Sequence, residues 1–258
     1  MPTSSPPAPP DAWTVLSLRP AGQHAGLRDA AARAGSRLLA LSPQRIAPRD
    51  DAATRRALAV ALAADIVVFT SPNAVRSAAQ LQRLRLRRGQ AALAVGDGTR
   101  RALARLGVDA QAPARMDSEG LLALPALRQV RGRKVGLVSG VGGRDRLAPA
   151  LQARGARVLR ADVYARLDRR IPASRWHALA ALLASGQRCW LALSSGEALR
   201  AWLAQCPDDV RDRLLAMPVV AASPRLATLA RDAGFARVHV ATSARPAALV
   251  DAARGAFG

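Results

Sequence analysis

Residues 65–79 read DIVVFTSPNAVRSAA, an apolar run followed by a polar turn and a helical pattern. The run 66–69 is β-branched and aromatic, which is typical of a strand buried on both faces of a parallel sheet. Small polar residues and a proline interrupt it at 70–73, and helical spacing begins at Ala74. A proline suits the first helical turn, because its missing N–H would have no partner there. The stretch therefore predicts a strand, a tight turn and a helix N-terminus whose free N–H groups suit an anion.

The composition predicts a globular protein with a basic surface. The chain has 258 residues, half of them apolar, which is enough for one large or two small domains. Its formal net charge is +21, and Lys134 is the only lysine among 39 basic residues. The charge favours an anionic partner, while an arginine-rich coding bias is the open alternative.

Several classes of protein are disfavoured by the same composition. Aromatic residues make up 3% of the chain, which leaves few platforms for stacking bases, and no basic run exceeds 85–88. Cys189 and Cys206 suit neither a disulfide framework nor a metal site. No apolar run is long enough to span a bilayer, and residues 1–11 lack the regions of a signal peptide. We expect a cytoplasmic protein without nucleic-acid or membrane partners.

Strand and helix patterns alternate along the chain, which predicts an α/β fold with parallel sheets and right-handed crossovers. Residues 1–11 contain five prolines and are expected to be a disordered tail. Strands are expected at 13–18, 36–41, 66–69, 91–95, 134–138, 157–161, 188–193, 218–222 and 237–240. Helices are expected at 25–34, 51–63, from 74, at 99–106, 119–129, 144–153 and 174–185, from 197, from 225, and at 246–254.

Three stretches recur at offsets of about 120–127 residues, which indicates two copies of one α/β unit. Residues 14–39 align with 134–159, the turn at Ser71 with that at Ser195, and 96–107 with 223–234. Chance likeness between βα units is the alternative.

The order of the copies predicts two similar flavodoxin-like domains, each a parallel sheet with helices on both faces. One domain combines 12–42 with 170–258, and the other covers 46–163. The segments 42–48 and 162–170 are expected to be irregular linkers that form a two-segment hinge beside a cleft.

Five segments together resemble the uroporphyrinogen-III synthase family, over nearly the whole chain from residue 13. They read LSLRPAGQ at 16–23, VVFTSPNAV at 67–75, VGDGTRRAL at 95–103, GVGGRDRLAPALQARGARV at 140–158 followed by DVYAR at 162–166, and SARPAALVDAA at 243–253.

The resemblance implies a lyase of tetrapyrrole and heme biosynthesis that needs no cofactor and no metal. Linear hydroxymethylbilane loses water, its terminal pyrrole ring is inverted, and the macrocycle closes as uroporphyrinogen III. The substrate is a polycarboxylate, which a basic surface and helix N-termini would suit. The enzyme would mainly select one folded conformer of the substrate. A monomer is expected, and the upstream bilane-forming enzyme is the protein partner to consider.

The resemblance also implies site residues. Tyr164 would assist departure of the hydroxyl group, with a tyrosine packed at a domain edge as the alternative. Thr99 would hold a carboxylate while capping a helix, with a cap alone as the alternative. The expected substrate contacts are Arg19, Ser71, Asn73, Gly96, Gly140, Gly142, Arg144, Ser194, Ser195 and Arg225.

The chain departs from the family pattern at two points. A second Gly-x-x-Thr turn is replaced by 223–226, where Arg225 would substitute a charge for the missing hydroxyl, and Ser139 stands where an arginine is common. An inactive relative is therefore an alternative, and two lobes on a double hinge would also suit a two-lobed anion- or solute-binding protein. The three histidines are expected at the surface or at edges: His24, His177 and His239.

Overall fold

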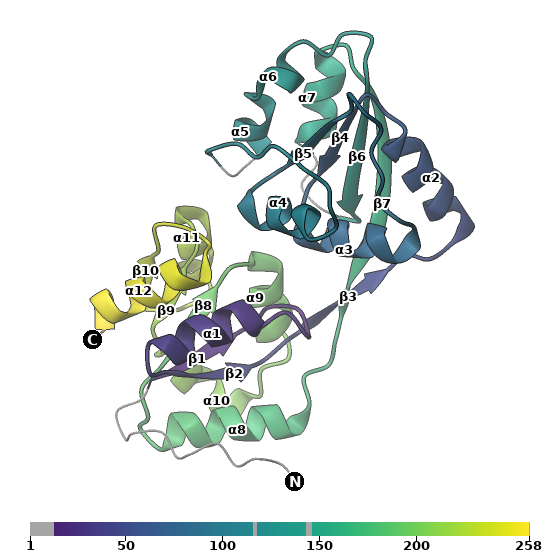
Figure 1. Ribbon diagram of the computed structural model, residues 1–258. Helices are drawn as coiled ribbons and strands as arrows, with labels where there is room; N and C mark the ends of the chain where they lie inside the picture. The colour runs from purple at the N-terminus through teal and green to yellow at the C-terminus, as the bar shows by residue number, and fades with distance from the viewer. Residues whose placement is uncertain (1–12, 116–117, 143–145, 258) are drawn as a thin grey trace. The chain divides into compact units, whose positions relative to one another are not determined.

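The computed structural model describes residues 13–115, 118–142 and 146–257 (Figure 1). The expected disordered tail and Arg144 lie outside these residues. The chain divides into two compact units, one comprising Met1–Arg45 with Leu167–Gly258 (unit 1) and the other Ile46–Arg166 (unit 2). The chain therefore passes from unit 1 to unit 2 near residue 45 and returns near residue 166.

Unit 2 is built on a five-stranded sheet in the order β3-β7-β6-β4-β5. The interior strand β4 pairs in parallel with β5 and β6, and the central strand β6 also pairs in parallel with β7. The strand predicted at 66–69 is thus confirmed, and it lies inside the sheet. The strands are β3 (Gln44–Pro48), β4 (Ile66–Phe69), β5 (Ala91–Ala94), β6 (Lys134–Gly140) and β7 (Arg157–Asp168).

Helices cover both faces of this sheet, which explains why β4 is apolar at every position. Val67 and Phe69 pack in a cluster with α2, α3 and α4, whereas Ile66 and Val68 pack in a second cluster with α5, α6 and α7. Figure 1 shows α2 on one side of the strands and α5 to α7 on the other. The helices are α2 (Ala52–Leu62), α3 (Pro72–Leu81), α4 (Asp97–Ala104), α5 (Ser118–Leu122), α6 (Pro125–Arg128) and α7 (Leu147–Ala153).

The structure corrects three of the expected elements in this region. The single helix expected at 119–129 is two short helices, because Pro125 starts a new helix and holds Leu124 in an extended conformation. Residues 162–168, expected to be irregular, continue β7, which pairs with β6 as far as Tyr164 and has the edge strand β3 as its other neighbour. Residues 44–48, expected to be a linker, form the edge strand β3.

Unit 1 repeats the architecture with a five-stranded sheet in the order β10-β9-β8-β1-β2, in which each of these neighbours is parallel. The helix at Asp208–Leu215 was not predicted, because only Val210 and Leu214 of this polar segment are buried. The elements are β1 (Thr14–Ser17), β2 (Arg37–Ala40), β8 (Cys189–Leu193), β9 (Val219–Ala221), β10 (Val238–Val240), α1 (Ala25–Arg33), α8 (Ala173–Ala184), α9 (Gly196–Leu203), α10 (Asp208–Leu215), α11 (Pro224–Asp232) and α12 (Pro246–Phe257).

The core of unit 1 is also split by its sheet. Leu16 and Leu191 face a cluster with α8 to α11, where the rings of Trp176 and Trp202 stack with centroids 6.2 Å apart. Val15 faces the other cluster with α1 and α12. The predicted α/β fold, with parallel strands and helices on both faces, is confirmed. None of the helices in the described ranges has the length and apolar character needed to cross a membrane.

Candidate functional site

A cavity of about 190 Å³ opens at the carboxyl ends of the strands in unit 2. Ligands of open parallel sheets bind at this edge, where the strands give way to helix N-termini. Its wall includes residues that directly follow β4, the last residues of β6, and residues of β7. The polar and charged lining consists of Thr70, Ser71, Ser118, Ser139, Arg160, Tyr164 and Arg166.

Tyr164 and Ser71 form the centre of this cavity. The Tyr164 side chain is 2% exposed, and its Oη lies 3.2 Å from Ser71 Oγ. Ser71 is also the N-cap of α3, where its Oγ accepts a hydrogen bond of 3.0 Å from the Ala74 N–H. The serine oxygen keeps a second lone pair and its own proton, so either hydroxyl can be the donor in the contact between Ser71 and Tyr164. The cap of α3 thereby fixes the position of the phenol.

Gly140 makes room for the tyrosine ring. A Cβ atom at this position would lie 2.3 Å from Cζ of Tyr164, a distance that side chains do not tolerate. The pairing of β6 with β7 shifts register between Ser139 and Gly140, so Gly140 pairs with Tyr164. Val141 N–H then donates to the Tyr164 carbonyl at 2.8 Å. The need for glycine here comes from this close approach.

Hydroxyl groups connect the ends of β4 and β6. Thr70 Oγ1 donates to Ser139 Oγ at 3.2 Å and lies 3.3 Å from the Val138 carbonyl. Ser139 occupies the position where the family commonly has an arginine, and it is nearly buried. The wall of the cavity at this point is therefore neutral and hydrogen-bonding.

Two arginines of β7 supply positive charge to the cavity, in different ways. Arg160 forms an ion pair with Asp162, with Nε 2.9 Å from Oδ2. Arg166 lies over the Tyr164 ring at 5.7 Å from its centroid and has no ion pair with another described residue. Arg166 is thus the more available cation for an anionic ligand.

The start of α4 differs from the expectation for Thr99. The N-cap is Gly96, which is extended, and Thr99 is the third helical residue with 2% of its surface exposed. The predicted capping role of Thr99 is therefore wrong, because Gly96 occupies the cap position. Asp97 pairs with Arg100 and Arg101 at 2.7 and 3.1 Å, which places a carboxylate at this helix N-terminus.

The matching edge of unit 1 carries the second group of predicted residues. Ser195 caps α9 by accepting a hydrogen bond of 3.2 Å from the Ala198 N–H, and Ser194 is exposed beside it. Ser223 is the N-cap of α11 without a side-chain cap bond, and Arg225 follows in the first turn. These residues come from the turns after β8 and β9.

Arg19, which follows β1, is unusual among the arginines. Its Nε is buried and has no hydrogen-bond partner within the described residues. Burial lowers the pKa of its guanidinium, because the charged form loses its water shell. A partly buried guanidinium whose Nε has no partner is an arrangement that an anionic ligand would complete.

His24 contradicts the expectation of a surface position. It is buried, with Nδ1 2.9 Å from Ser17 Oγ and Nε2 2.8 Å from Ser42 Oγ. Burial and the neighbouring arginines lower its pKa to about 4. Sequence reasoning missed it because its serine partners lie 7 and 18 residues away, on other elements. His177 and His239 are exposed, as predicted.

The structure thus brings Tyr164, Ser71 and Gly140 together in one cavity, while Arg19, Ser194, Ser195 and Arg225 belong to unit 1. Asn73 Oδ1 accepts a hydrogen bond of 2.6 Å from Arg76. Gly142 lies in an exposed turn, with φ of 76°. The described residues contain no group of three or more His, Cys, Asp or Glu side chains able to hold a metal ion.

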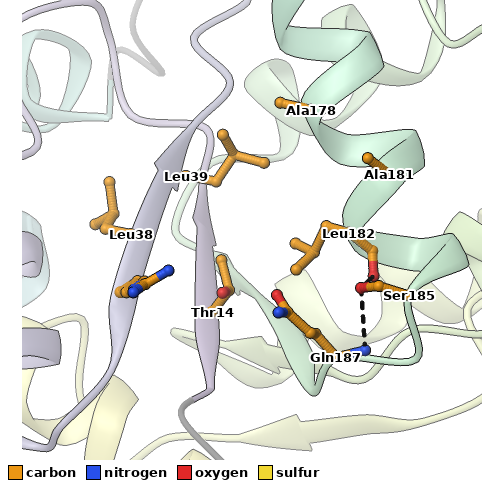
Figure 2. A pocket seen from close by; sticks show the side chains of 9 residues that line it. Thr14, Leu38, Leu39, Ala178, Ala181, Leu182, Ser185 and Gln187 are labelled. Carbon is orange, nitrogen blue, oxygen red and sulfur yellow. Dashed lines mark hydrogen bonds between the residues drawn. The ribbon is translucent and has the colours of Figure 1, made fainter. Parts of the chain in front are cut away.

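A cavity of about 450 Å³, larger than the Tyr164 cavity of unit 2, lies in unit 1 between β2 and α8 (Figure 2). Most of its wall is apolar, with Leu39 and Leu182 pointing toward each other. Its hydrogen bond, from Gln187 N–H to Ser185 Oγ at 3.5 Å, is local to the turn after α8. Since it includes Thr14, the first residue of β1, it is not at the carboxyl edge where the polar residues gather.

The fold and the site together define a class of protein with two flavodoxin-like units, of which the first is formed by both ends of the chain and the second by its middle. Each unit has polar residues at the carboxyl edge of its sheet. The family model described as uroporphyrinogen-III synthase HemD matches residues 26–251. The chain belongs to the uroporphyrinogen-III synthase family, as its motifs indicated.

Two curated relatives support this assignment over about half of the chain. The uroporphyrinogen-III synthases of Salmonella typhimurium and Escherichia coli are 35% and 34% identical over 140 residues, which is 52% of this chain and 54% of each relative. The match thus spans about half the length of these curated relatives.

Two solved structures share the fold across both units. A mutant uroporphyrinogen III synthase from Thermus thermophilus matches with a TM-score of 0.60 and 21% identity, covering 95% of this chain and 99% of that one. Uroporphyrinogen-III synthetase from Helicobacter pylori matches with a TM-score of 0.61 and 12% identity, covering 94% and 98%.

Proposed function

We propose that the protein is an active uroporphyrinogen-III synthase. It converts linear hydroxymethylbilane to uroporphyrinogen III, with loss of water and inversion of the terminal pyrrole ring, without a cofactor. The observation that carries the proposal is the buried Tyr164 hydroxyl, held 3.2 Å from Ser71 Oγ in the wall of a polar cavity of a family member. Electron-rich pyrroles supply the carbon nucleophiles, so the protein mainly orients the chain and assists the leaving hydroxyl.

Tyr164 is the group that assists departure of the hydroxyl. When Ser71 is the donor to Tyr164 Oη, the phenol proton is free to be donated into the cavity. The C–O bond of the substrate breaks as water forms with that proton, and the adjoining pyrrole nitrogen supplies the electron pair. Proton loss from the ring carbon after closure restores aromaticity and balances the charge.

The substrate carboxylates are bound by groups at the carboxyl edges of the sheets. Arg19 and Arg166 are two cations that have no carboxylate partner among the described residues, and Arg225 lies in the first turn of α11. The N-termini of α3 and α9 add backbone N–H groups. The other proposed contacts are Thr99, Asn73, Gly96, Gly140, Gly142, Arg144, Ser194 and Ser195.

We also propose that the protein acts as a cytoplasmic monomer, and that the bilane-forming enzyme is its partner in substrate transfer. The two domains would be 12–42 with 170–258 and 46–163, joined by 42–48 and 162–170 as a hinge. The division of the chain into two compact units supports the proposed domains, because the chain passes between the units at only two places, one in β3 and one in β7.

The deciding experiment supplies freshly prepared hydroxymethylbilane, oxidises the product and separates the type III and type I isomers. We expect type III from the wild-type protein and a kcat lowered about 10–100-fold in Tyr164→Phe, because a positioned proton donor contributes at least this much. Type I alone would refute the proposal. Full activity of the folded variant would remove Tyr164 from the mechanism.

Arg19→Met provides a second test on the substrate side. We expect KM to rise about tenfold or more, since a charge-assisted hydrogen bond contributes about 1.5–3 kcal/mol. The free energy of unfolding should increase at the same time, because methionine removes a partly buried charge whose Nε has no hydrogen-bond partner in the described residues. Arg33→Ala, an exposed arginine at the end of α1, is the control. An unchanged KM would exclude Arg19 from binding.

A further inference from the structure

We propose that unit 1 contains a separate oxyanion site, here called the His24 pocket, which binds a carboxylate or phosphate group. It is a cavity of about 270 Å³ lined by Gly22, His24, Ser42, Arg169, Pro172 and Arg175, among others. Its wall combines the turn before α1, the residues after β2 and the segment that leads into α8. None of these residues lines the Tyr164 cavity of unit 2.

The charge of the His24 pocket is positive and unneutralised. Its lining residues include two arginines and no acidic side chain. Arg169 and Arg175 have no ion pair with another described residue. The charges of Arg28, Arg19 and Arg175 all act on the His24 ring, so the positive potential reaches the floor of the pocket. An anion entering here would relieve the mutual repulsion of these cations.

Two helix N-termini contribute residues to the same wall. His24 is the N-cap of α1 and Pro172 is the N-cap of α8. Neither helix has a side-chain cap or an acidic residue in its first turn, and the first backbone bonds start at the third residue, where Leu27 N–H donates to His24 and Arg175 N–H to Pro172. The N–H groups of the first two residues of each helix are therefore the donors left for a ligand. Both helices exceed eight residues and direct partial positive charge toward their starts.

The floor of the pocket is a preorganised polar group. His24 is 6% exposed and Ser42 is 5% exposed, and His24 Nε2 lies 2.8 Å from Ser42 Oγ. Ser17 holds the other ring nitrogen at 2.9 Å, so the ring orientation is fixed from both sides. Surface arginines alone bind anions weakly because water screens them. Here Arg169 and Arg175 line the same pocket as the buried His24 and Ser42, which are hydrogen-bonded to each other, and as the starts of two helices. Together these groups suit an oxyanion.

Under the proposed function, on which this step rests, the pocket would take one carboxylate arm of the tetrapyrrole. The oxyanion site itself does not depend on that function. Free phosphate has the same chemistry, and the two sources can be separated by the probe that is used.

The test follows the His24 imidazole by NMR in the full-length protein during titration with sodium phosphate, sodium acetate and uroporphyrin III. We expect saturable shifts of the His24 signals, and a His24 pKa that rises on binding, because an anion stabilises the imidazolium. In Arg169→Ala/Arg175→Ala, the Kd should increase about tenfold or more, equivalent to about 1.4 kcal/mol. Arg33→Ala removes a charge outside the pocket and should leave the Kd unchanged.

Saturation by uroporphyrin III that phosphate displaces assigns the pocket to a tetrapyrrole carboxylate, whereas saturation by phosphate alone assigns it to inorganic phosphate. The absence of saturable shifts with all three probes, or equal shifts in the double variant, would overturn the proposal. The isomer assay on the same samples is independent of this result, so failure of the pocket and failure of the proposed activity are distinguishable.

Discussion

At the scale of single residues, the site depends on the fit of one aromatic ring against one glycine. Gly140 lies in β6 directly beside Tyr164, and the space of its missing side chain is filled by the ring. The phenol in turn reaches the serine that caps α3. A change at any of these three positions is therefore expected to act on the other two.

Gly140→Ala should displace the tyrosine ring. We expect the free energy of unfolding to fall by about 1–3 kcal/mol, as is usual for overpacking, together with a loss of turnover. Urea unfolding and the isomer assay measure the two effects. In a Tyr164→Ala background the same substitution should cost much less stability, because the ring is gone. Equal costs in both backgrounds would show that the glycine is needed for another reason.

His24 should make stability depend on pH. Its pKa is lowered to about 4 in the folded protein, from 6.5, so the unfolded chain binds more protons between these values. Above pH 6.5 His24 is neutral in both states and costs no stability. The free energy of unfolding then falls as the pH drops from 6.5 through about 4, because the unfolded chain takes up the proton first. We expect unfolding free energy to drop on the order of 1–3 kcal/mol between pH 7 and 4. His24→Asn should flatten this part of the profile in urea unfolding, and an unchanged profile would contradict the assignment.

At the scale of elements, helix starts after the strands hold most of the candidate site. Ser71 and Ser195 both cap the helix that follows a strand, as their turns suggested. Ser71 differs because it also contacts Tyr164. The two roles of Ser71, capping α3 and positioning Tyr164, can therefore be separated by comparing its substitution with that of a residue that only caps a helix in the same unit.

Asp51 provides that comparison, because its side chain caps α2 by accepting from the Thr54 N–H at 2.8 Å and lies outside the cavity. Ser71→Ala and Asp51→Ala should each lower unfolding free energy by about 1 kcal/mol, the usual cost of a lost cap. Only Ser71→Ala should also lower kcat. Isomer assays at matched folded fractions decide between the two roles, and equal kcat values would mean that Ser71 is only a cap.

The elements also show what the sequence could predict. The apolar run 66–69 and the serine turn after it predicted β4 and the start of α3, because burial on both faces and capping are local signals. The length of β7 was missed because pairing with other strands, not composition, determines it: β7 pairs with β6 as far as Tyr164 and has β3 as its other neighbour. The contact of Tyr164 with Ser71 joins residues 93 apart, so only the folded sheet reveals it.

At the scale of the whole molecule, the internal repeat corresponds to a shared sheet order. Equating β1, β2, β8 and β9 with β6, β7, β4 and β5 gives the same neighbour sequence in both units. The chain order differs, because the elements of unit 1 are split around unit 2. Unit 2 is thus one continuous segment, whereas unit 1 needs both ends of the chain.

This difference predicts unequal behaviour of fragments. Residues 46–166 contain β4, β5 and β6 in full, most of β3 and β7, and the clusters on both faces of the sheet, so we expect this fragment to fold alone with one cooperative urea transition. Residues 167–258 lack β1, the strand that joins β8 to β2, and should remain largely unfolded. Adding residues 13–45 as a separate peptide should restore folding, because it returns β1, β2 and α1. Circular dichroism and amide exchange provide the measurement; folding of 167–258 without the peptide would show that β1 is not needed to form the core of unit 1.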